Sequence, residues 1–198
     1  MLTLPADLVL GSTSIYRAAL LRRLLPEFSI ARPEVDETPF DGEAPLALAV
    51  RLAREKCLSV SAKFPSSIVI GADQVADRNG ASVGKAGNRA NAIIDLQSSS
   101  GQKLHFHSAV CVQYLGELYP FVDTTICHFR TLTTAEIIVY LDADQPFDCA
   151  GSIKTESLGI SLLTRMESND PTGVIGLPLI ELSRILRGFQ PSAITPAP

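Results

Sequence analysis

The residues of this chain that are best suited to chemistry are two carboxylates and three cationic side chains. The carboxylates belong to Glu37 and Asp73, and the cations to Arg17, Lys56 and Lys85. Carboxylates bind hard divalent cations and accept protons from water, while lysine and arginine neutralise phosphate groups. These residue types suit chemistry on a metal–polyphosphate, because phosphoryl transfer needs positioning and charge neutralisation more than a covalent nucleophile.

A second group of polar residues lies in the stretch "GSTSIYR" at 11–17, between an apolar segment and a helix. Ser12 and Ser14 can cap that helix and leave backbone N–H groups free to bind phosphate. Arg17, in the first turn, could add a forked donor. The stretch does not contain the GxxxxGK[ST] pattern, so it is not a P-loop. A plain helix cap with a surface arginine is the alternative.

The elements that must position these residues begin with the apolar run at 68–72, which predicts a buried strand that Gly71 closes. Asp73 and Gln74 then stand at the carboxyl end of the strand, where ligands bind in open α/β sheets. An aspartate that caps a turn is the alternative for Asp73. Lys56 lies in the middle of a helix, where a solvated face is the ordinary position.

Hydrophobic periodicity and turn residues predict the remaining elements. Thr133 and Glu136 form a capping box, and "DRNG" at 77–80 is typical of a hairpin turn. The alternation of elements predicts an α/β fold with an antiparallel part. Helices are expected over 15–25, 45–62, 88–97, 134–141 and 178–188, and strands over 8–10, 68–72, 104–114, 119–130 and 159–165.

Length, charge and cysteine spacing exclude several classes of protein. The 198 residues suit one domain or two small lobes, and a net charge of −4 disfavours binding to a nucleic acid backbone. The cysteines lie far apart without a CxxC pair, which argues against zinc or disulfides and fits core positions in a reducing cytosol. We expect neither a membrane helix nor a signal peptide, because no apolar run is long enough and the N-terminus lacks a basic region.

Seven stretches of this chain, taken in order, resemble the motifs of the Maf family of nucleotide pyrophosphatases. They span about residues 8–187 and are "LVLGSTSIYR", "PEVDETP", "LAREKC", "IVIGADQV", "GK" at 84–85, "FDCAGSIKTESLGISL" and "DPTGVIGLPLIEL". Gln74 and the last two stretches look most similar to the YceF-type subgroup. That subgroup is associated with the hydrolysis of 7-methyl-GTP to 7-methyl-GMP and pyrophosphate.

The resemblance implies a Maf/ITPase-like, two-lobed α/β fold around a mixed, partly antiparallel sheet with a central cleft. It implies a single domain over 1–189, followed by a proline-rich tail at 190–198 that we expect to be disordered. It also implies a cytoplasmic enzyme, a homodimer, that acts on a nucleotide with Mg²⁺ or Mn²⁺. No binding to nucleic acid or membranes is expected.

The resemblance also implies roles for single residues. Asp73 matches the proton acceptor of the family, and Glu37 and Asp73 are the expected metal-binding residues. Which of the two carboxylates acts as base and which as metal ligand stays open at this point. The other catalytic residues are expected to be Lys56 and Lys85. The expected substrate-binding residues are Ser12, Ser14 and Arg17, and the positions linked to base choice are Tyr16, Gln74 and Glu156.

The base-choice positions have a physical logic. An N7-methylated guanine carries positive charge on its ring, and the aromatic face of Tyr16 attracts a cation. Glu156 offers a carboxylate to that charge or to the guanine donors, and Gln74 can donate and accept. Taken without the resemblance, Tyr16 would be a partly buried helix residue and Glu156 a surface charge.

The chain departs from the usual family pattern at three positions, Ile15, Ala18 and Ala86. The family usually has proline at the first and third and a second arginine at the second, so one phosphate donor is missing. Two other functions stay open: a pyrophosphatase for dTTP, UTP or other nucleotides, and a nucleotide-binding regulator of cell division.

Overall fold

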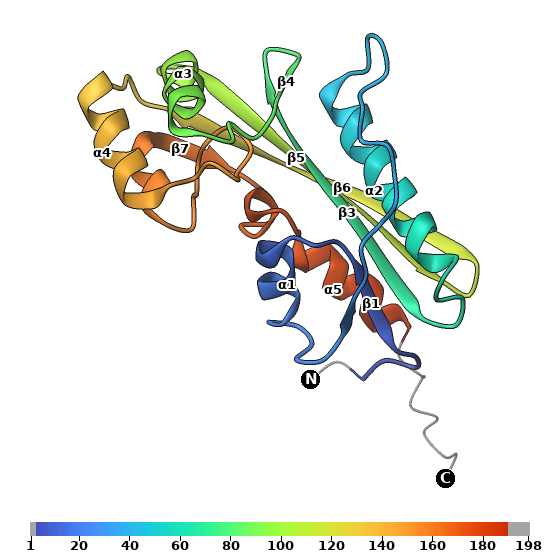
Figure 1. Ribbon diagram of the computed structural model, residues 1–198. Coiled ribbons are helices and arrows are strands. Elements are labelled where there is room, and N and C mark those ends of the chain that lie inside the picture. Colours follow the sequence, from blue (N-terminus) through green and yellow to red (C-terminus); the bar gives the residue numbers. More distant parts are fainter. Residues whose placement is uncertain (1–2, 190–198) are drawn as a thin grey trace.

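A seven-stranded mixed sheet is the framework of the computed structural model, which describes residues 3–189 (Figure 1). The strands lie in the order β2-β1-β3-β5-β6-β7, with β4 paired to β3. Strand β1 is parallel to β2 and β3, and the other pairs are antiparallel. The tail at 190–198 lies outside the described residues.

In chain order the elements are β1 (Leu8–Gly11), α1 (Ile15–Leu21), β2 (Ser29–Ile30), α2 (Pro45–Ser61), β3 (Ile68–Arg78), β4 (Ala81–Val83), α3 (Arg89–Ser99), β5 (Lys103–Tyr114), β6 (Glu117–Phe129), α4 (Thr134–Asp144), η1 (Leu158–Leu162), β7 (Leu163–Glu167), η2 (Gly173–Ile175) and α5 (Leu179–Gly188).

Strand β3 is longer than the sequence predicts, and this corrects the expected position of the two polar residues. The strand does not end at residue 72, as predicted, but continues to Arg78, because β5 pairs with it from Val69 to Asp77. Such a long ladder outweighs the weak strand preference of glycine. Asp73 and Gln74 therefore lie inside the strand, on opposite faces of the sheet, and the interpretation of Asp73 as a turn cap is wrong.

A gap in strand pairing marks the position of the site. On one edge of β3, strand β1 pairs as far as Gly71, and β4 pairs only from Ala76 onward. The registers of the described strands thus leave residues 72–75 without a partner on that edge. Figure 1 shows β1 and β4 at opposite ends of this gap. Side chains from both faces of the sheet can reach the opening.

Helices cover both faces of the sheet around this gap. Helices α1 and α5 pack on one face, and α2 packs on the other (Figure 1). Helices α3 and α4 cover the far end of the long strands around a second large core. The first core includes Leu10, Leu21, Ile70 and Leu182, the second includes Leu96, Phe106, Ile137 and Leu141, and the α2 side includes Cys57, Val60 and Cys111.

Most of the other elements confirm the sequence predictions. The capping box of Thr133 and Glu136 begins α4, and the predicted hairpin turn joins β3 to β4. Helix α1 is shorter than expected and ends at Leu21. A 3₁₀ helix, η1, takes the place of the first residues of the strand predicted over 159–165.

The observed architecture confirms the predicted fold class, an α/β fold around a mixed, partly antiparallel sheet. The two large cores at opposite ends of the long strands correspond to the two expected lobes. Three of the four cysteines are buried, as the sequence predicts, whereas Cys149 is half-buried. Within residues 3–189, no helix combines the length and the apolar character that crossing a membrane requires.

Candidate active site

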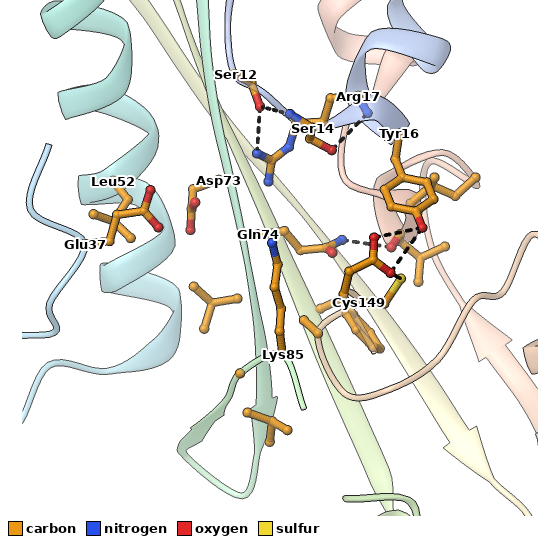
Figure 2. A pocket seen from close by; sticks show the side chains of 18 of the residues that line it. Ser12, Ser14, Tyr16, Arg17, Glu37, Leu52, Asp73, Gln74, Lys85 and Cys149 are labelled. Carbon is orange, nitrogen blue, oxygen red and sulfur yellow. Dashed lines mark hydrogen bonds between the residues drawn. The ribbon is translucent and has the colours of Figure 1, made fainter. Parts of the chain in front are cut away.

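A cleft of about 600 Å³ opens at the gap beside β3 (Figure 2). Its walls come from the β1–α1 loop, the segment before α2, α2 itself, β3, the β4 end, the segment after α4 and η2. Every residue for which the sequence predicts a catalytic, metal-binding, substrate-binding or base-choice role lines this cleft. These residues are Ser12, Ser14, Tyr16, Arg17, Glu37, Lys56, Asp73, Gln74, Lys85 and Glu156.

The two carboxylates meet at one lysine. Lys56 Nζ lies 2.7 Å from Glu37 Oε1 and 2.7 Å from Asp73 Oδ1. Lys56 is only 6% exposed, so the alternative interpretation, a lysine on a solvated helix face, is wrong. A buried ammonium group needs such partners, because an unpaired charge in the protein interior is very costly. Each carboxylate uses one oxygen for this contact and keeps a second oxygen for other ligands.

Gly71 explains how α2 comes close enough to β3 for this contact. A Cβ atom at this position would overlap the backbone of Ala53 and Cys57 in α2. The glycine therefore permits helix and strand to touch, and it brings Lys56, one residue before Cys57, next to the strand that carries Asp73.

Burial changes the acid–base properties of Asp73, which is 7% exposed. Loss of solvation raises the pKa of its carboxyl group above the ordinary value, and the charges of Lys56 and Arg17 lower the pKa in part. Glu37, whose side chain is 61% exposed, adds a like charge that raises the pKa of Asp73 further. Asp73 is therefore a stronger proton acceptor than an ordinary aspartate.

The β1–α1 loop holds its polar groups by internal hydrogen bonds. Ser14 caps α1 and accepts from the Arg17 backbone N–H at 3.3 Å. The Arg17 guanidinium donates to Ser12 Oγ at 3.2 Å and to the Gly176 carbonyl at 3.0 Å. Arg17 is thus a fixed, half-buried wall of the cleft and not the free surface arginine of the alternative interpretation.

The opposite end of the cleft carries an aromatic ring and further acceptors. The Tyr16 hydroxyl donates to the Asp148 carboxylate at 3.2 Å, and burial is the main cause that raises the pKa of Tyr16. Lys85 and Glu156 line the cleft as exposed side chains. Sequence reasoning missed Asp148, although this residue lies in the quoted stretch "FDCAGSIKTESLGISL".

The described residues do not form a complete metal site by themselves. Between residues 3 and 189, no three His, Cys, Asp or Glu side chains come together as a ligand set. Glu37 and Asp73 are the two cleft carboxylates that share a contact, and their oxygens are of the type that hard divalent cations prefer.

Comparison with known proteins identifies the family. The model of the family described as "Maf-like protein" matches residues 7–189. The chain belongs to the Maf family. Ala18, where the expected Maf pattern has a second arginine, is 4% exposed and packs in the core beside α5. It is not among the residues that line the cleft, so an arginine at this position would have to leave the core to reach a ligand there.

Two curated relatives in the Maf family share about half of the sequence. A 7-methyl-GTP pyrophosphatase of Xanthomonas oryzae pv. oryzae (strain MAFF 311018) is 52% identical over 185 residues, which cover 92% of this chain and 97% of that protein. A 7-methyl-GTP pyrophosphatase of Bordetella pertussis (strain Tohama I) is 46% identical over the full length of both chains. Among solved structures, the Ham1 protein of Staphylococcus aureus matches 62% of this chain and 71% of its own, with 15% identity and a TM-score of 0.42.

Proposed function

We propose that this protein is a nucleoside triphosphate pyrophosphatase that hydrolyses 7-methyl-GTP to 7-methyl-GMP and pyrophosphate. The observation that carries the proposal is the meeting of Glu37, Lys56 and Asp73 in one cleft whose other end offers an aromatic ring and carboxylates. The names of the full-length relatives support the same substrate.

The donor atoms at the charged end fit a divalent cation, Mg²⁺ or Mn²⁺. Glu37 and Asp73 would hold it through the oxygens that Lys56 does not use, and the substrate phosphates would complete the ligand set. When bound, such a cation neutralises phosphate charge and lowers the pKa of water. An incomplete protein site is what this arrangement calls for, since magnesium sites in phosphoryl-transfer enzymes commonly use one or two carboxylates and phosphate oxygens.

The side chains of the chain itself supply the proton transfer and the positioning. Asp73 takes a proton from the attacking water, because it is a buried carboxylate that Lys56 holds in the cleft. The water oxygen bonds to the α-phosphorus, and the bond from that phosphorus to the bridging oxygen breaks, so that pyrophosphate leaves. Arg17 and Lys85 contact the phosphates, with Ser12 and Ser14 beside them, and Lys56 keeps the two carboxylates in place.

The other end of the cleft holds the base. Tyr16 offers its ring to the positively charged 7-methylguanine, and such contacts are worth about 0.5–2 kcal/mol. Glu156, an exposed carboxylate in the wall, faces the same charge or the guanine N–H donors. Gln74 adds a neutral polar contact. A cationic base that carries donors therefore suits this end better than a neutral pyrimidine.

A panel of nucleotides tests the proposal. We would incubate the protein with 7-methyl-GTP, GTP, dTTP and UTP, with and without Mg²⁺, and identify the products. The proposal expects 7-methyl-GMP and pyrophosphate from 7-methyl-GTP at the highest kcat/KM, in the presence of the metal. Faster cleavage of dTTP or UTP would support the other pyrophosphatase function, and binding without turnover would support a regulator.

The homodimer and the cytoplasmic location that the sequence implies stay predictions. Sedimentation velocity of the full chain checks the first, because a dimer of 21.2 kDa chains has twice the mass of the monomer. Fractionation of cells that express the protein checks the second.

A further inference from the structure

Gln74 lies with its amide nitrogen surrounded by acceptors. Its Nε2 atom donates to the carbonyl oxygens of Val174 at 2.8 Å and Gly173 at 3.1 Å, and to Ser108 Oγ at 2.9 Å. Backbone carbonyls accept but never donate hydrogen bonds. Turning the amide around would place its oxygen against two carbonyl oxygens, so chemistry fixes the nitrogen in this position.

Ser108, on the neighbouring strand, is the third acceptor of the Gln74 amide. It lies on β5 directly opposite Gln74 of β3 and has an exposed fraction of 0%. Its hydroxyl donates to the Gly173 carbonyl at 2.6 Å. Because the only hydrogen of the hydroxyl is used in that bond, Ser108 meets Gln74 as an acceptor.

The segment that supplies the carbonyls is itself held close to the sheet. A Cβ atom at Gly173 would overlap the carboxylate of Asp123, which lies opposite Ser108 on β6. The absence of a side chain at Gly173 leaves room for that carboxylate next to the point where the Ser108 hydroxyl reaches the Gly173 carbonyl. Ser108 links three elements, β3, β5 and η2, at one point.

We propose that Ser108 is a positioning residue for base recognition, which fixes Gln74 so that the cleft meets only the carbonyl oxygen of its amide. The inference rests on the proposed function, in which this end of the cleft holds the base. Gln74 then presents only an acceptor to the cleft. The sequence alone allows a glutamine at this position either to donate or to accept. Gln74 selects a base with an N–H donor on the facing edge, and guanine has two such donors, N1–H and the N2 amine.

Three matched nucleotides reveal the selected donor. ITP lacks only the N2 amine of GTP, whereas 2-aminopurine riboside triphosphate lacks the N1–H together with the O6 carbonyl, so the Gln74→Ala variant is needed to separate the loss of the donor from the loss of O6. For the wild-type protein we expect kcat/KM for GTP to exceed that of at least one of the two by about tenfold, because a missing donor leaves an unsatisfied acceptor. A wild-type protein that treats all three nucleotides alike overturns the inference.

A double-mutant cycle separates positioning from a merely structural role. Ser108→Ala should reduce the larger of the two kcat/KM ratios, GTP over ITP or GTP over the 2-aminopurine nucleotide, to about threefold or less, mainly through KM. The amide then loses one of its three acceptors, and the Gly173 carbonyl loses the hydroxyl that holds it, so the amide is held less closely. Gln74→Ala should bring the ratio near one, and adding Ser108→Ala to that variant should leave it unchanged. A ratio that stays at the wild-type value in Ser108→Ala, or that changes when Ser108→Ala is added to Gln74→Ala, contradicts the proposal.

The control and the second readout keep the test decisive. Ser99→Ala removes another fully buried serine hydroxyl, one that contacts Arg78 outside the cleft lining, and it should leave the ratio unchanged. If Ser108→Ala does not fold, Ser108→Cys keeps the size and a weak donor, and it should give an intermediate ratio. A wild-type ratio in Ser108→Cys would then count against the proposal.

Calorimetric binding of GMP, IMP and 2-aminopurine riboside monophosphate without metal gives the same ratios independently of turnover. A protein that cleaves no triphosphate but shows these binding ratios would refute the proposed hydrolysis and support the role of Ser108. A protein that cleaves 7-methyl-GTP but binds the three monophosphates equally would support the proposed hydrolysis and refute the role of Ser108.

Discussion

On one face of β3, Asp73 lies in a charged cluster with Lys56 and Glu37, whereas the next residue, Gln74, lies on the other face among neutral groups. The charged face depends on close packing of α2 at Gly71. The neutral face depends on two backbone carbonyls and a buried serine. The alternation of a single strand thus separates the two kinds of surroundings by one residue.

The two faces of β3 therefore suit different functions. On the charged face, burial raises the pKa of Asp73 and the carboxylate oxygens can bind a cation, so this face suits proton transfer and phosphate chemistry. A neutral hydrogen-bonded amide has a fixed direction and no charge to titrate, so it suits recognition. We therefore expect changes on the charged face to lower kcat, and changes at the opposite end of the cleft to alter KM and base preference.

The largest effect should follow from Asp73→Asn, which keeps the size of the side chain and removes the proton acceptor. We expect kcat to fall by about 100-fold or more, with a much smaller change in KM. Asp77→Asn changes a carboxylate on the same strand outside the cleft lining and serves as the control. Near-normal turnover in Asp73→Asn would contradict the role of Asp73 as proton acceptor and the assignment of catalysis to the charged face.

A smaller loss is expected for Lys56→Met, because the two carboxylates then lose the ammonium group that holds them. A charged hydrogen bond is worth roughly 1.5–3 kcal/mol, which corresponds to about a tenfold to hundredfold decrease in kcat/KM. Lys63→Met removes a lysine from an exposed ion pair with Glu34 and should have little effect. Equal activities of the two variants would contradict the proposed positioning by Lys56.

The same variant should change the pH profile. A proton acceptor works only when unprotonated, so kcat/KM falls as the pH drops through the pKa of Asp73. Lys56 lowers that pKa in part, and its removal should raise the pKa and move the acidic limb to higher pH. We would measure kcat/KM from pH 4 to 8 for both proteins, and an acidic limb at lower pH in Lys56→Met would contradict this account.

At the base end, Tyr16→Leu should lower the preference for 7-methyl-GTP over GTP by about two- to tenfold, because the ring no longer faces the positive charge. Tyr16→Phe keeps the ring and loses only the hydrogen bond to Asp148, so it should keep most of the preference. The measurement is the ratio of kcat/KM values for the two nucleotides. If both variants lost the preference equally, the hydroxyl rather than the ring would be responsible.

The smallest effect is expected for Glu156→Gln, since its carboxylate is exposed to solvent. We expect the preference for the methylated base to decrease by about two- to threefold, in line with the weak energies of exposed charge pairs. Glu117→Gln, at the first residue of β6 and outside the cleft lining, is the control. Unchanged selectivity would contradict the proposed role of Glu156 in base recognition.

Much of this picture could be predicted from the sequence, and the failures have physical causes. Local patterns predict α2, β5, β6 and the capping box of α4 because periodicity and caps are properties of neighbouring residues. The end of β3 could not be predicted, because long-range pairing with β5 decides it. The burial of Lys56 could not be predicted either, because its partners come from two distant segments.

The residues of the cleft show the same division. Those that the family resemblance names all line the cleft, but their roles stay predictions. Ser108 could not be found from sequence, since a serine in an apolar strand gives no signal until η2 packs against it. Asp148 lies inside a recognisable stretch, yet only the fold brings it to Tyr16.

The central claim is that the charged face of β3 directs water to the α-phosphorus while the other end only holds the base. Hydrolysis of 7-methyl-GTP in water enriched with oxygen-18, followed by mass spectrometry of both products, tests it most directly. The account predicts that the heavy oxygen enters 7-methyl-GMP and that the released pyrophosphate carries none. Heavy oxygen in pyrophosphate instead would mean attack at the β-phosphorus, and the account would be wrong.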